Sequence, residues 1–260
     1  MELVCQVRHS LPRVGTRKLH HMLKETFAAD QLRVGRDKLF TILREEGLLI
    51  GKKRRYTITT NSKHWMKKYP NIIKDTTISR PEQVWVSDIT YIDAGENFEY
   101  LHLVTDAYSK QIMGYHLSDN MSAVETARAL RMAINNRNYP GKALVHHSDR
   151  GLQYCSKLYT DILKSNNIDI SMTEQSDPYE NAVAERINGI LKDEFGLDGR
   201  FEDISQLHKQ TAQAIDLYNN VRPHLSNHML TPMQMHQQQD LPIKKYNKKA
   251  PVNLSLPVLF

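Results

Sequence analysis

Hydrophobic residues recur at helical spacing in the first fifty positions of the chain. Two series show this spacing: Leu19, Met22, Leu23 and Phe27, and then Leu39, Ile42 and Leu43. Apolar residues three and four positions apart share one face of a helix, so the pattern predicts two short helices with Val34-Gly35 between them. Gly47 follows the second series and is placed to end that helix, since glycine is common just beyond a helix terminus.

A basic run comes directly after these helices and consists of Lys52, Lys53, Arg54 and Arg55. A small helical unit with a cationic extension is typical of DNA-binding regions. We therefore predict that residues 1–56 form a helix-turn-helix-like DNA-binding region, with these four side chains in contact with DNA. Helix pairs with charged flanks are also common on ordinary solvated surfaces, and this alternative remains. Residues 57–80 are polar, aperiodic and rich in lysine, and we interpret them as a basic linker that orders on DNA.

The pattern changes at Val84, where β-branched and aromatic residues dominate short segments. Three such segments, residues 84–92, 100–106 and 111–117, are joined by short turns and predict three consecutive antiparallel strands. Helical and strand-like segments then alternate, with Ser122 and Ser156 placed as helix caps and strands expected at 143–148 and 168–172. The order of elements predicts an α/β fold of the ribonuclease-H-like layout, a mixed five-stranded sheet with helices on both faces. This catalytic core would span residues 81–240, followed by a basic tail at 241–260.

A further helix is expected after Met172. The stretch Asp177-Pro178-Tyr179-Glu180 has the form of a capping box, with Asp177 as the cap and proline in the first turn. Along this helix the apolar residues share one face: Val183, Ile187, Ile190 and Leu191. The opposite face carries polar side chains within about 60° of arc: Asn181, Glu185, Asn188 and Lys192.

The net charge of +6 conceals a segregation of charge along the chain. Residues 1–80 contain 18 Lys and Arg against 7 Asp and Glu, a net charge of +11. Residues 241–260 hold four lysines and no acid, which leaves residues 81–240 at −9. Clustered Lys and Arg next to an acidic body favour a nucleic-acid partner, because neutralising phosphates releases counterions.

Other features of composition narrow the class of protein. Only Cys5 and Cys155 are present, so neither a disulfide framework nor thiolate zinc ligation is expected, and His20 and His21 have no cysteine pair beside them. No stretch approaches the length of a membrane-spanning segment and no secretory signal is evident. We expect a soluble, cytoplasmic protein with no membrane partner.

Three acidic residues are the candidate chemical groups. Asp88 lies within the first strand and Asp149 ends the fourth, and these strands are neighbours in the predicted sheet. Glu185 lies on the polar face of the later helix, with 35 residues between it and Asp149, a spacing that decides nothing alone. Asp106 also ends an apolar strand and is the main rival for the first position, but we interpret it as a turn residue.

The residues around these acids carry a resemblance to a known family. WVSDITYI, HHSDRGLQY and DPYENAVAERINGILKDEF together resemble the catalytic core of bacterial insertion-sequence transposases, which are relatives of retroviral integrases. VTDAYSKQIMGYHLS, YNNVRPHLSNHMLTP and REEGLL match as well, so the resemblance covers about residues 10–235. Within that family, the sequence looks like the product of the second reading frame (OrfB) of two-frame elements.

The resemblance implies that Asp88, Asp149 and Glu185 are a metal-binding catalytic triad (the DDE type) and that Lys192 contacts DNA. Converging carboxylates at ~4 Å would repel by about 4 kcal/mol per pair, so a divalent cation is needed. Oxygen ligands favour Mg²⁺, as two ions, with Mn²⁺ as a substitute. Because the acidic core repels phosphate, basic side chains of residues 1–80 together with Arg186 and Lys192 are expected to hold the DNA, and Asn181 and Asn188 lie on the same helix face.

The expected reaction is cleavage that frees the 3′ end of an insertion sequence, followed by strand transfer of that end. His146 and His147 are interpreted as packing or hydrogen-bonding residues, and Tyr91, Tyr154 and Tyr159 as packing residues rather than covalent nucleophiles. The expected partners are the element ends and target DNA, further copies of the chain on DNA, and the upstream-frame product or a fusion with it, in a bacterial cytoplasm near the nucleoid. Two alternatives remain, namely a ribonuclease H or junction resolvase that does not join strands, and a non-enzymatic DNA-binding regulator.

Overall fold

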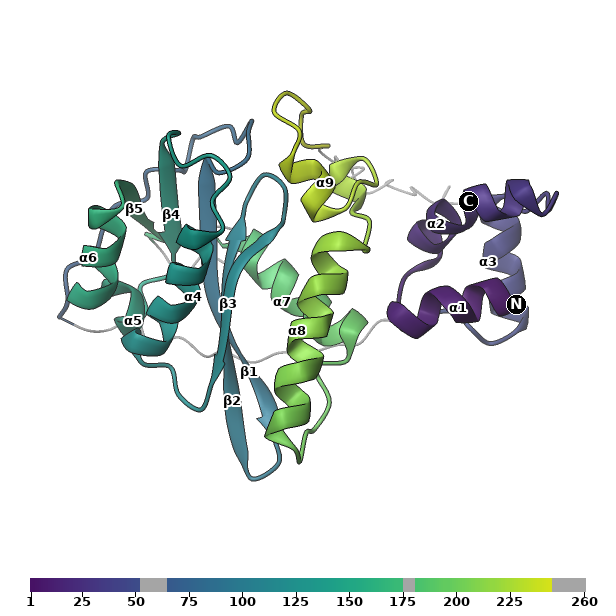
Figure 1. Cartoon of the computed structure of the whole chain (residues 1–260), viewed down its shortest axis with the longest axis horizontal. Coiled ribbons are helices and arrows are strands. Elements are labelled where there is room, and N and C mark those ends of the chain that lie inside the picture. The colour runs from purple at the N-terminus through teal and green to yellow at the C-terminus, as the bar shows by residue number, and fades with distance from the viewer. Residues whose placement is uncertain (52–64, 175–180, 245–260) are drawn as a thin grey trace, which may run out of the picture.

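The computed structural model describes residues 1–51, 65–174 and 181–244 (Figure 1). The N-terminal helices are α1 (Glu2–Ser10), α2 (Thr16–Ala29) and α3 (Arg36–Glu45). The two predicted helices are present, and Gly47 adopts φ +65° just beyond α3, where the Leu48 amide donates to the Leu43 carbonyl at 2.7 Å. This is the helix-ending geometry for which glycine is favoured.

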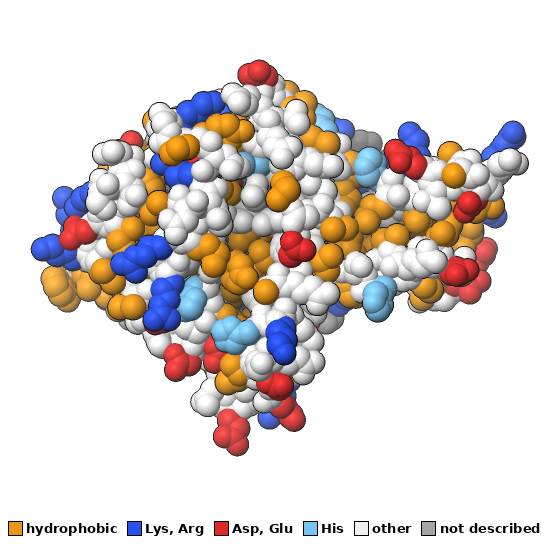
Figure 2. Space-filling view, viewed as in Figure 1, with side chains coloured by type: hydrophobic (Ala, Val, Ile, Leu, Met, Phe, Trp, Pro, Cys, Tyr) orange, Lys and Arg blue, Asp and Glu red, His pale blue; other side chains and the backbone are white. Residues whose placement is uncertain are grey.

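Helix α1 is absent from the prediction because it has neither a side-chain cap nor a long apolar series. It is held by packing instead. The N-terminal helices bury one apolar cluster: Val4, Leu11, Val14, Leu19, Leu23, Phe27, Leu39 and Leu43. Figure 2 shows hydrophobic side chains gathered on the side of these helices that faces the rest of the molecule.

The sheet has the predicted composition and connection. Its strands are β1 (Val84–Ala94), β2 (Asn97–Asp106), β3 (Ile112–Ser118), β4 (Leu144–Ser148) and β5 (Ile168–Met172). Their spatial order is β3-β2-β1-β4-β5. The first three strands pair antiparallel, while β4 pairs parallel to β1 and β5 parallel to β4. The mixed five-stranded sheet is therefore confirmed.

Helices cover both faces of this sheet (Figure 1). On one face α4 (Ala123–Asn135), the short α5 (Leu152–Cys155) and α6 (Lys157–Ser165) bury a cluster around Trp85, Met113 and Tyr159. On the other face α7 (Ala182–Phe195) and α8 (Ile204–Asn220) bury a cluster around Ile92, Leu101 and Tyr218. The Ser122 and Ser156 hydroxyls accept from backbone amides at the starts of α4 and α6, so both predicted caps are confirmed.

The chain ends of this core lie against the sheet domain. Part of the predicted linker runs beside β5, where the Met172 amide donates to the Pro70 carbonyl at 3.3 Å and the Ile72 amide donates to Ser171 Oγ at 3.1 Å. After α8 come a 3-10 turn, η1 (Leu225–Asn227), and the short helix α9 (Pro232–His236) with a capping box at Thr231. Within the described ranges, every helix is too short or too polar to span a lipid bilayer.

Candidate active site

The register of the central strands brings Asp88 and Asp149 to the same level of the sheet. Val86 pairs with His147 in the parallel ladder between β1 and β4. Asp88 and Asp149 each follow two residues later, so both side chains point to the same face as Val86 and His147. Asp149 leaves the ladder at a turn, where the Gly151 amide donates to its Oδ1 atom at 2.9 Å.

Hydrogen bonds hold both oxygens of the Asp88 carboxylate. Oδ1 accepts from the Ile89 amide at 2.9 Å, and Oδ2 accepts from the Asn188 side-chain amide at 2.7 Å. Burial and the negative charges of Asp149 and Glu185 raise the pKa of Asp88 to about 7, against the lowering effect of these two hydrogen bonds. The two hydrogen bonds therefore fix the orientation of the carboxylate, while burial and the neighbouring acids disfavour its ionised form.

Glu185 lies in the first turn of α7, the helix that contacts β1 through Asn181 and Asn188. Its side chain is exposed, although partial burial still raises the pKa of the carboxyl group. Its charge reaches Asp88, but in the described part of the chain no three acidic, histidine or cysteine side chains are close enough to form a metal cage. Asp88 and Asp149 therefore form the organised part of the site, with Glu185 at its exposed side.

The predicted polar face of α7 divides into buried and exposed positions. Asn181 is the N-cap of α7 and is buried, and its side-chain amide donates to the Ser87 carbonyl at 3.1 Å. Asn188 is buried against Asp88, and its Oδ1 atom accepts no hydrogen bond from any residue that the structure describes. The predicted cap at Asp177 lies outside the described residues. Both asparagines thus contact β1 directly.

The two predicted cations on α7 are accessible. Arg186 is exposed, and Lys192 is half-buried with its Nζ atom 4.3 Å from the centre of the Tyr91 ring. This cation-π contact places Lys192 near the middle of β1, two helical turns beyond Glu185. The other predicted DNA contacts, Lys52, Lys53, Arg54 and Arg55, lie outside the described residues.

Buried polar side chains of β1, β4 and β5 lie next to the carboxylates along the strands. His146 Nε2 is 2.7 Å from Ser87 Oγ and 2.9 Å from Tyr159 Oη, and His147 Nδ1 is 2.8 Å from Ser171 Oγ. Burial, together with His147, lowers the pKa of His146 to about 3, so the ring is neutral. The interpretation of both histidines as hydrogen-bonding residues is confirmed, as is the packing of Tyr154 and Tyr159, which are fully buried.

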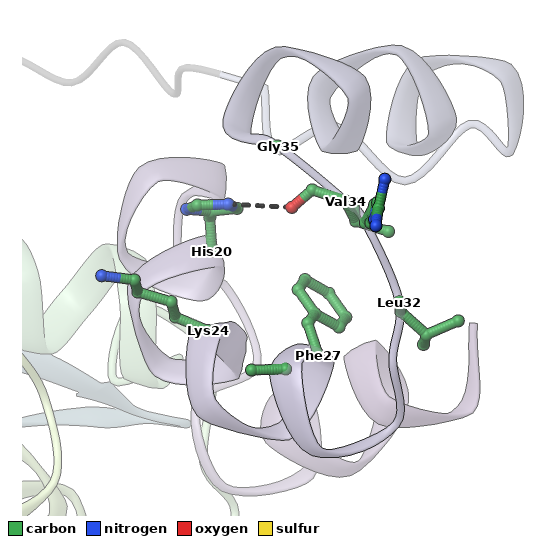
Figure 3. A pocket seen from close by; sticks show the side chains of 8 residues that line it. His20, Lys24, Phe27, Leu32, Val34 and Gly35 are labelled. Atoms are coloured by element: carbon green, nitrogen blue, oxygen red, sulfur yellow. Dashed lines mark hydrogen bonds between the residues drawn. The ribbon is translucent and has the colours of Figure 1, made fainter.

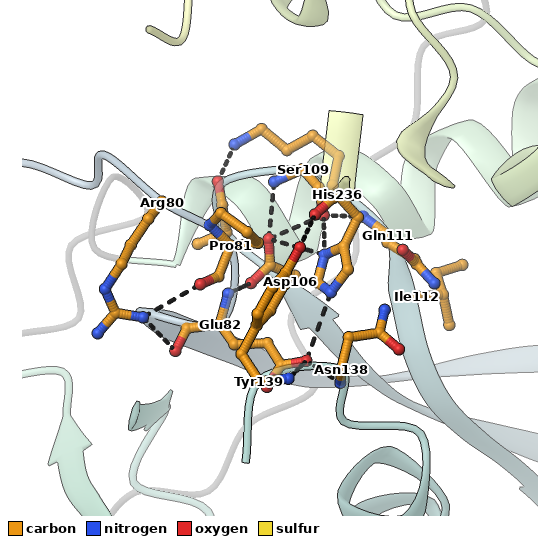
Figure 4. Close-up of polar contacts among 12 residues, drawn as sticks. Arg80, Pro81, Glu82, Asp106, Ser109, Gln111, Ile112, Asn138, Tyr139 and His236 are labelled. Atoms are coloured by element: carbon orange, nitrogen blue, oxygen red, sulfur yellow. Dashed lines mark hydrogen bonds and ion pairs between the residues drawn. The ribbon is translucent and has the colours of Figure 1, made fainter. Parts of the chain in front are cut away.

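Asp106 belongs to a separate buried network (Figure 4). Its Oδ1 atom accepts from the Ser109 amide at 2.7 Å and from Ser109 Oγ at 2.8 Å, which confirms the turn role. His236 of α9 lies between Asp106 and Glu82, at 3.7 Å and 3.5 Å, and Arg137 donates to Glu82 at 3.0 Å. The sequence pattern missed this network because its members are far apart along the chain.

A hollow of about 400 Å³ lies in the N-terminal region, between α2 and the segment 32–35 that leads to α3 (Figure 3). Its walls include Phe27, Leu32 and Lys24, and His20 Nε2 lies 3.1 Å from the Val34 carbonyl at its edge. None of the residues that line it is acidic.

Comparisons with known proteins agree with this arrangement. Two sequence families, each described as integrase core domain, match residues 78–178 and 166–232. The insertion element IS600 uncharacterized 31 kDa protein of Shigella sonnei is 34% identical over 228 residues, which are 86% of this chain and 82% of that protein. The transposase for insertion sequence element IS629 of Shigella sonnei is 32% identical over 209 residues, 80% of this chain and 68% of that protein.

A solved structure has the same fold. A chain in the simian T-cell lymphotropic virus intasome matches with a TM-score of 0.54 at 20% sequence identity, covering 91% of this chain and 79% of that one. The ribonuclease-H-like layout is thereby confirmed.

Proposed function

The chain belongs to the integrase-core transposases of bacterial insertion sequences, of the second-reading-frame type, and from that membership we propose that Asp88, Asp149 and Glu185 are its catalytic residues. As a member of this family it is an enzyme of the DDE transposase and integrase class that acts on DNA. The proposal assigns cleavage at the element end and strand transfer to one site at the carboxyl end of β4.

The observation that carries the assignment is the state of Asp88. Both of its oxygens are held by hydrogen bonds, while burial and two neighbouring carboxylates raise its pKa to about 7. A carboxylate that is oriented but short of positive charge is suited to bind a cation, and perturbed acids of this kind are typical of catalytic sites.

A divalent metal fits the donor set of this site. Asp88 and Asp149 would supply carboxylate oxygens, Glu185 would supply a third from the exposed side, and Asn188 Oδ1 is a buried oxygen without a donor among the described residues. These hard oxygen donors favour Mg²⁺, as two ions, with Mn²⁺ as a substitute. When bound, the metal would offset the carboxylate charge and polarise the phosphodiester.

The chemistry needs no covalent enzyme intermediate. In cleavage, water attacks the phosphorus, the bond to the 3′ oxygen breaks, and that oxygen takes up a proton. In strand transfer, the freed 3′ hydroxyl attacks the phosphorus of a target phosphodiester and loses its proton, the bond from that phosphorus to the target 3′ oxygen breaks, and the released oxygen takes up a proton. The carboxylates orient the attacking and leaving groups, and the buried tyrosines Tyr154 and Tyr159 remain uncharged because burial raises their pKa values.

DNA must be held against the acidic core by basic side chains. We assign this role to Lys192 and Arg186 on α7, and to the N-terminal region with its basic run Lys52, Lys53, Arg54 and Arg55. Asn181 and Asn188 contact β1, so we now interpret them as residues that orient the site beside the DNA path. The proposed assembly is an oligomer on DNA at the nucleoid, together with the upstream-frame product or as a fusion with it.

The decisive experiment is a cleavage assay on a duplex that carries the terminal repeat of the element, with Mg²⁺ present. Asp149→Asn is expected to reduce cleavage on the order of a thousandfold or more while DNA affinity is unchanged or higher, because one negative charge is removed. Asp169→Asn on the neighbouring strand β5 is the matched control, since Asp169 is exposed, and it should cut normally. Normal cutting by Asp149→Asn would refute the assignment.

A joining assay with pre-cut ends separates the remaining alternatives. The transposase should join these ends to target DNA, whereas a ribonuclease H or junction resolvase would cut without joining. A regulator without enzymatic activity would bind the same duplex and give neither product at any Mg²⁺ or Mn²⁺ concentration.

A further inference from the structure

A buried ion network joins the N-terminal helices to the last turn of α7. Lys18 of α2 donates to Glu194 Oε1 at 3.0 Å and to Oε2 at 3.2 Å. Arg222, in the turn after α8, donates to the same carboxylate through Nε at 2.8 Å and Nη2 at 2.6 Å. One carboxylate therefore receives two cations from opposite ends of the chain.

The three side chains of this network are largely shielded from solvent. The side chains of Lys18, Glu194 and Arg222 are 11%, 18% and 2% exposed. Arg222 Nη1 also donates to His224 Nε2 at 2.7 Å, and burial and Arg222 keep the pKa of His224 well below its usual value, so the ring stays neutral and accepts. Apolar contacts flank the ion pair, because Phe195 and Leu217 pack against the N-terminal apolar cluster.

Lys18 is not needed to neutralise Glu194. The planar guanidinium of Arg222 already binds both carboxylate oxygens in the bidentate geometry that arginine favours. Burial and the nearby Arg222 and Arg186 work against the charged form of Lys18, and its pKa falls to about 8 despite Glu194. Desolvation offsets much of the attraction within a buried charge pair, so the net stability that the pair adds is small, and such a pair can instead select one geometry.

The partner of Lys18 lies on the helix that carries Glu185. Glu194 follows Glu185 by nine residues, which is about 13 Å along a continuous α-helix. The N-terminal half of α7 is attached to β1 through Asn181 and Asn188. Helix α7 therefore links α2 to β1: Lys18 of α2 contacts its last turn, and its first half contacts the strand that carries Asp88.

We propose that Lys18 is a positioning residue that fixes the N-terminal helices against α7, so that DNA held by those helices reaches the carboxylates in one register. This inference rests on the proposed function, in which the N-terminal region binds DNA and Asp88, Asp149 and Glu185 cut it. Lys18 itself touches no reacting atom.

The test measures the rate and the position of cutting by the full chain at saturating DNA, in single turnover, on a duplex with the terminal repeat of the element. Lys18→Glu places a carboxylate against Glu194 and should open the junction. We expect a rate at least about tenfold lower and cut sites spread over several neighbouring phosphodiesters, since small misplacements of substrate cost large factors in rate. Lys18→Arg keeps the charge and should restore a single cut site.

Lys209→Glu is the matched control, because Lys209 is exposed on α8 and the change in formal charge is the same. It should cut at the wild-type position. A single wild-type cut site at the wild-type rate in Lys18→Glu would overturn the proposal, as would an equal effect of Lys209→Glu, which would show a general charge effect on DNA binding.

Two outcomes separate this inference from the proposed function and from misfolding. If the unchanged chain does not cut in Mg²⁺, the proposed function fails, whatever Lys18 does. If Lys18→Glu unfolds, as seen by circular dichroism, Lys18→Met replaces it, because methionine removes the ion pair and tolerates burial. A spread of cut sites in Lys18→Met supports the proposal, and a single site at the wild-type position overturns it.

Discussion

Asn188 shows how one amide organises a site made of acids. Its Nδ2 atom donates to Asp88 Oδ2 at 2.7 Å, and its buried Oδ1 atom is left without a donor from the described residues. The hydrogen bond favours the ionised form of Asp88, which burial and two neighbouring carboxylates oppose. Asn188 therefore supports the negative charge and the orientation of the carboxylate at once.

We expect Asn188→Ala to reduce the single-turnover rate of Mg²⁺-dependent cleavage by about 10- to 100-fold, the usual effect of losing a residue that orients a ligand. The loss should be smaller than that of Asp149→Asn, and half-maximal cleavage should need more Mg²⁺. Asn166→Ala, at the C-cap of α6, is the control and should leave the Mg²⁺ dependence unchanged, because the Asn166 side-chain amide donates to the Ile162 carbonyl and to Ser165 Oγ and not to a carboxylate. An unaltered Mg²⁺ dependence in Asn188→Ala would show that the amide does not support the site.

At the scale of single residues, the sequence named candidate residues but not the side chains that they contact. The flanking motifs singled out Asp88, Asp149 and Glu185, and helical periodicity placed Asn188 on the face of Glu185. The partner of Asn188 could not be predicted in the same way, because it depends on how α7 crosses β1 in space. The same holds for Lys18, whose ion pair with Glu194 spans 176 positions.

Gly114 allows the backbone of strand β3 to lie directly against helix α4. A Cβ atom at Gly114 would meet the backbone of Ala129 and of Ala133, at the carbonyl and amide of the facing helix. Backbone atoms cannot move aside as a flexible side chain can, so a larger residue must push the helix from the sheet. Ala129 and Ala133 also belong to the apolar cluster around Met113.

Gly114→Ala is expected to lower the free energy of unfolding by about 1–3 kcal/mol, the usual cost of overpacking a buried contact. Urea denaturation followed by circular dichroism measures the loss. Gly141→Ala is the control, because no atom lies within 4 Å of a Cβ added at Gly141, and it should change stability little. Equal stability of the two variants would mean that α4 can shift at no cost.

Elements with strong local signals were predicted closely, and elements held by packing were not. The serine caps at Ser122 and Ser156 and the five strands follow from local chemistry and agree with the structure. Helix α1 has no cap and was missed, since its stability comes from Val4 and its neighbours in the apolar cluster. The motif at residues 218–232 was recognised without a role. In the structure this segment connects α7 and the turn between β2 and β3. Tyr218 Oη donates to the Lys110 carbonyl, Arg222 binds Glu194, and Asn227 donates to the Ser109 carbonyl.

The molecule as a whole is tied together by ionic contacts between distant segments. Lys18 and Glu194 join the N-terminal helices to α7, and the network around His236 joins α9 to the ends of β1 and β2 (Figure 4). Neither contact could be predicted from local pattern, because charged residues have no periodicity that identifies a distant partner. These contacts add segments to a sheet domain whose own cores are apolar.

The network around His236 gives stability a defined dependence on pH. Burial alone would lower the pKa of His236, but its contacts with Asp106 and Glu82 raise it to about 9. Arg137 and Tyr139 also face this group, Arg137 through its bond to Glu82 and Tyr139 through its ring and its hydroxyl, which donates to the His236 carbonyl. The protonated imidazole thus lies between two carboxylates that are otherwise buried.

The sign of the pH effect follows from a pKa that is higher in the folded than in the unfolded chain. The contribution is complete below the ordinary histidine pKa of about 6.5 and is lost as pH rises through about 9, an upper bound of about 3 kcal/mol. Urea denaturation between about pH 7 and about pH 10 should therefore show a steeper loss of stability for the unchanged chain than for His236→Gln. His208→Gln, at an exposed position of α8, should keep the steep profile. Parallel profiles for His236→Gln and the unchanged chain would show that His236 is neutral in the folded protein, and that α9 is held to the sheet by packing and uncharged hydrogen bonds alone.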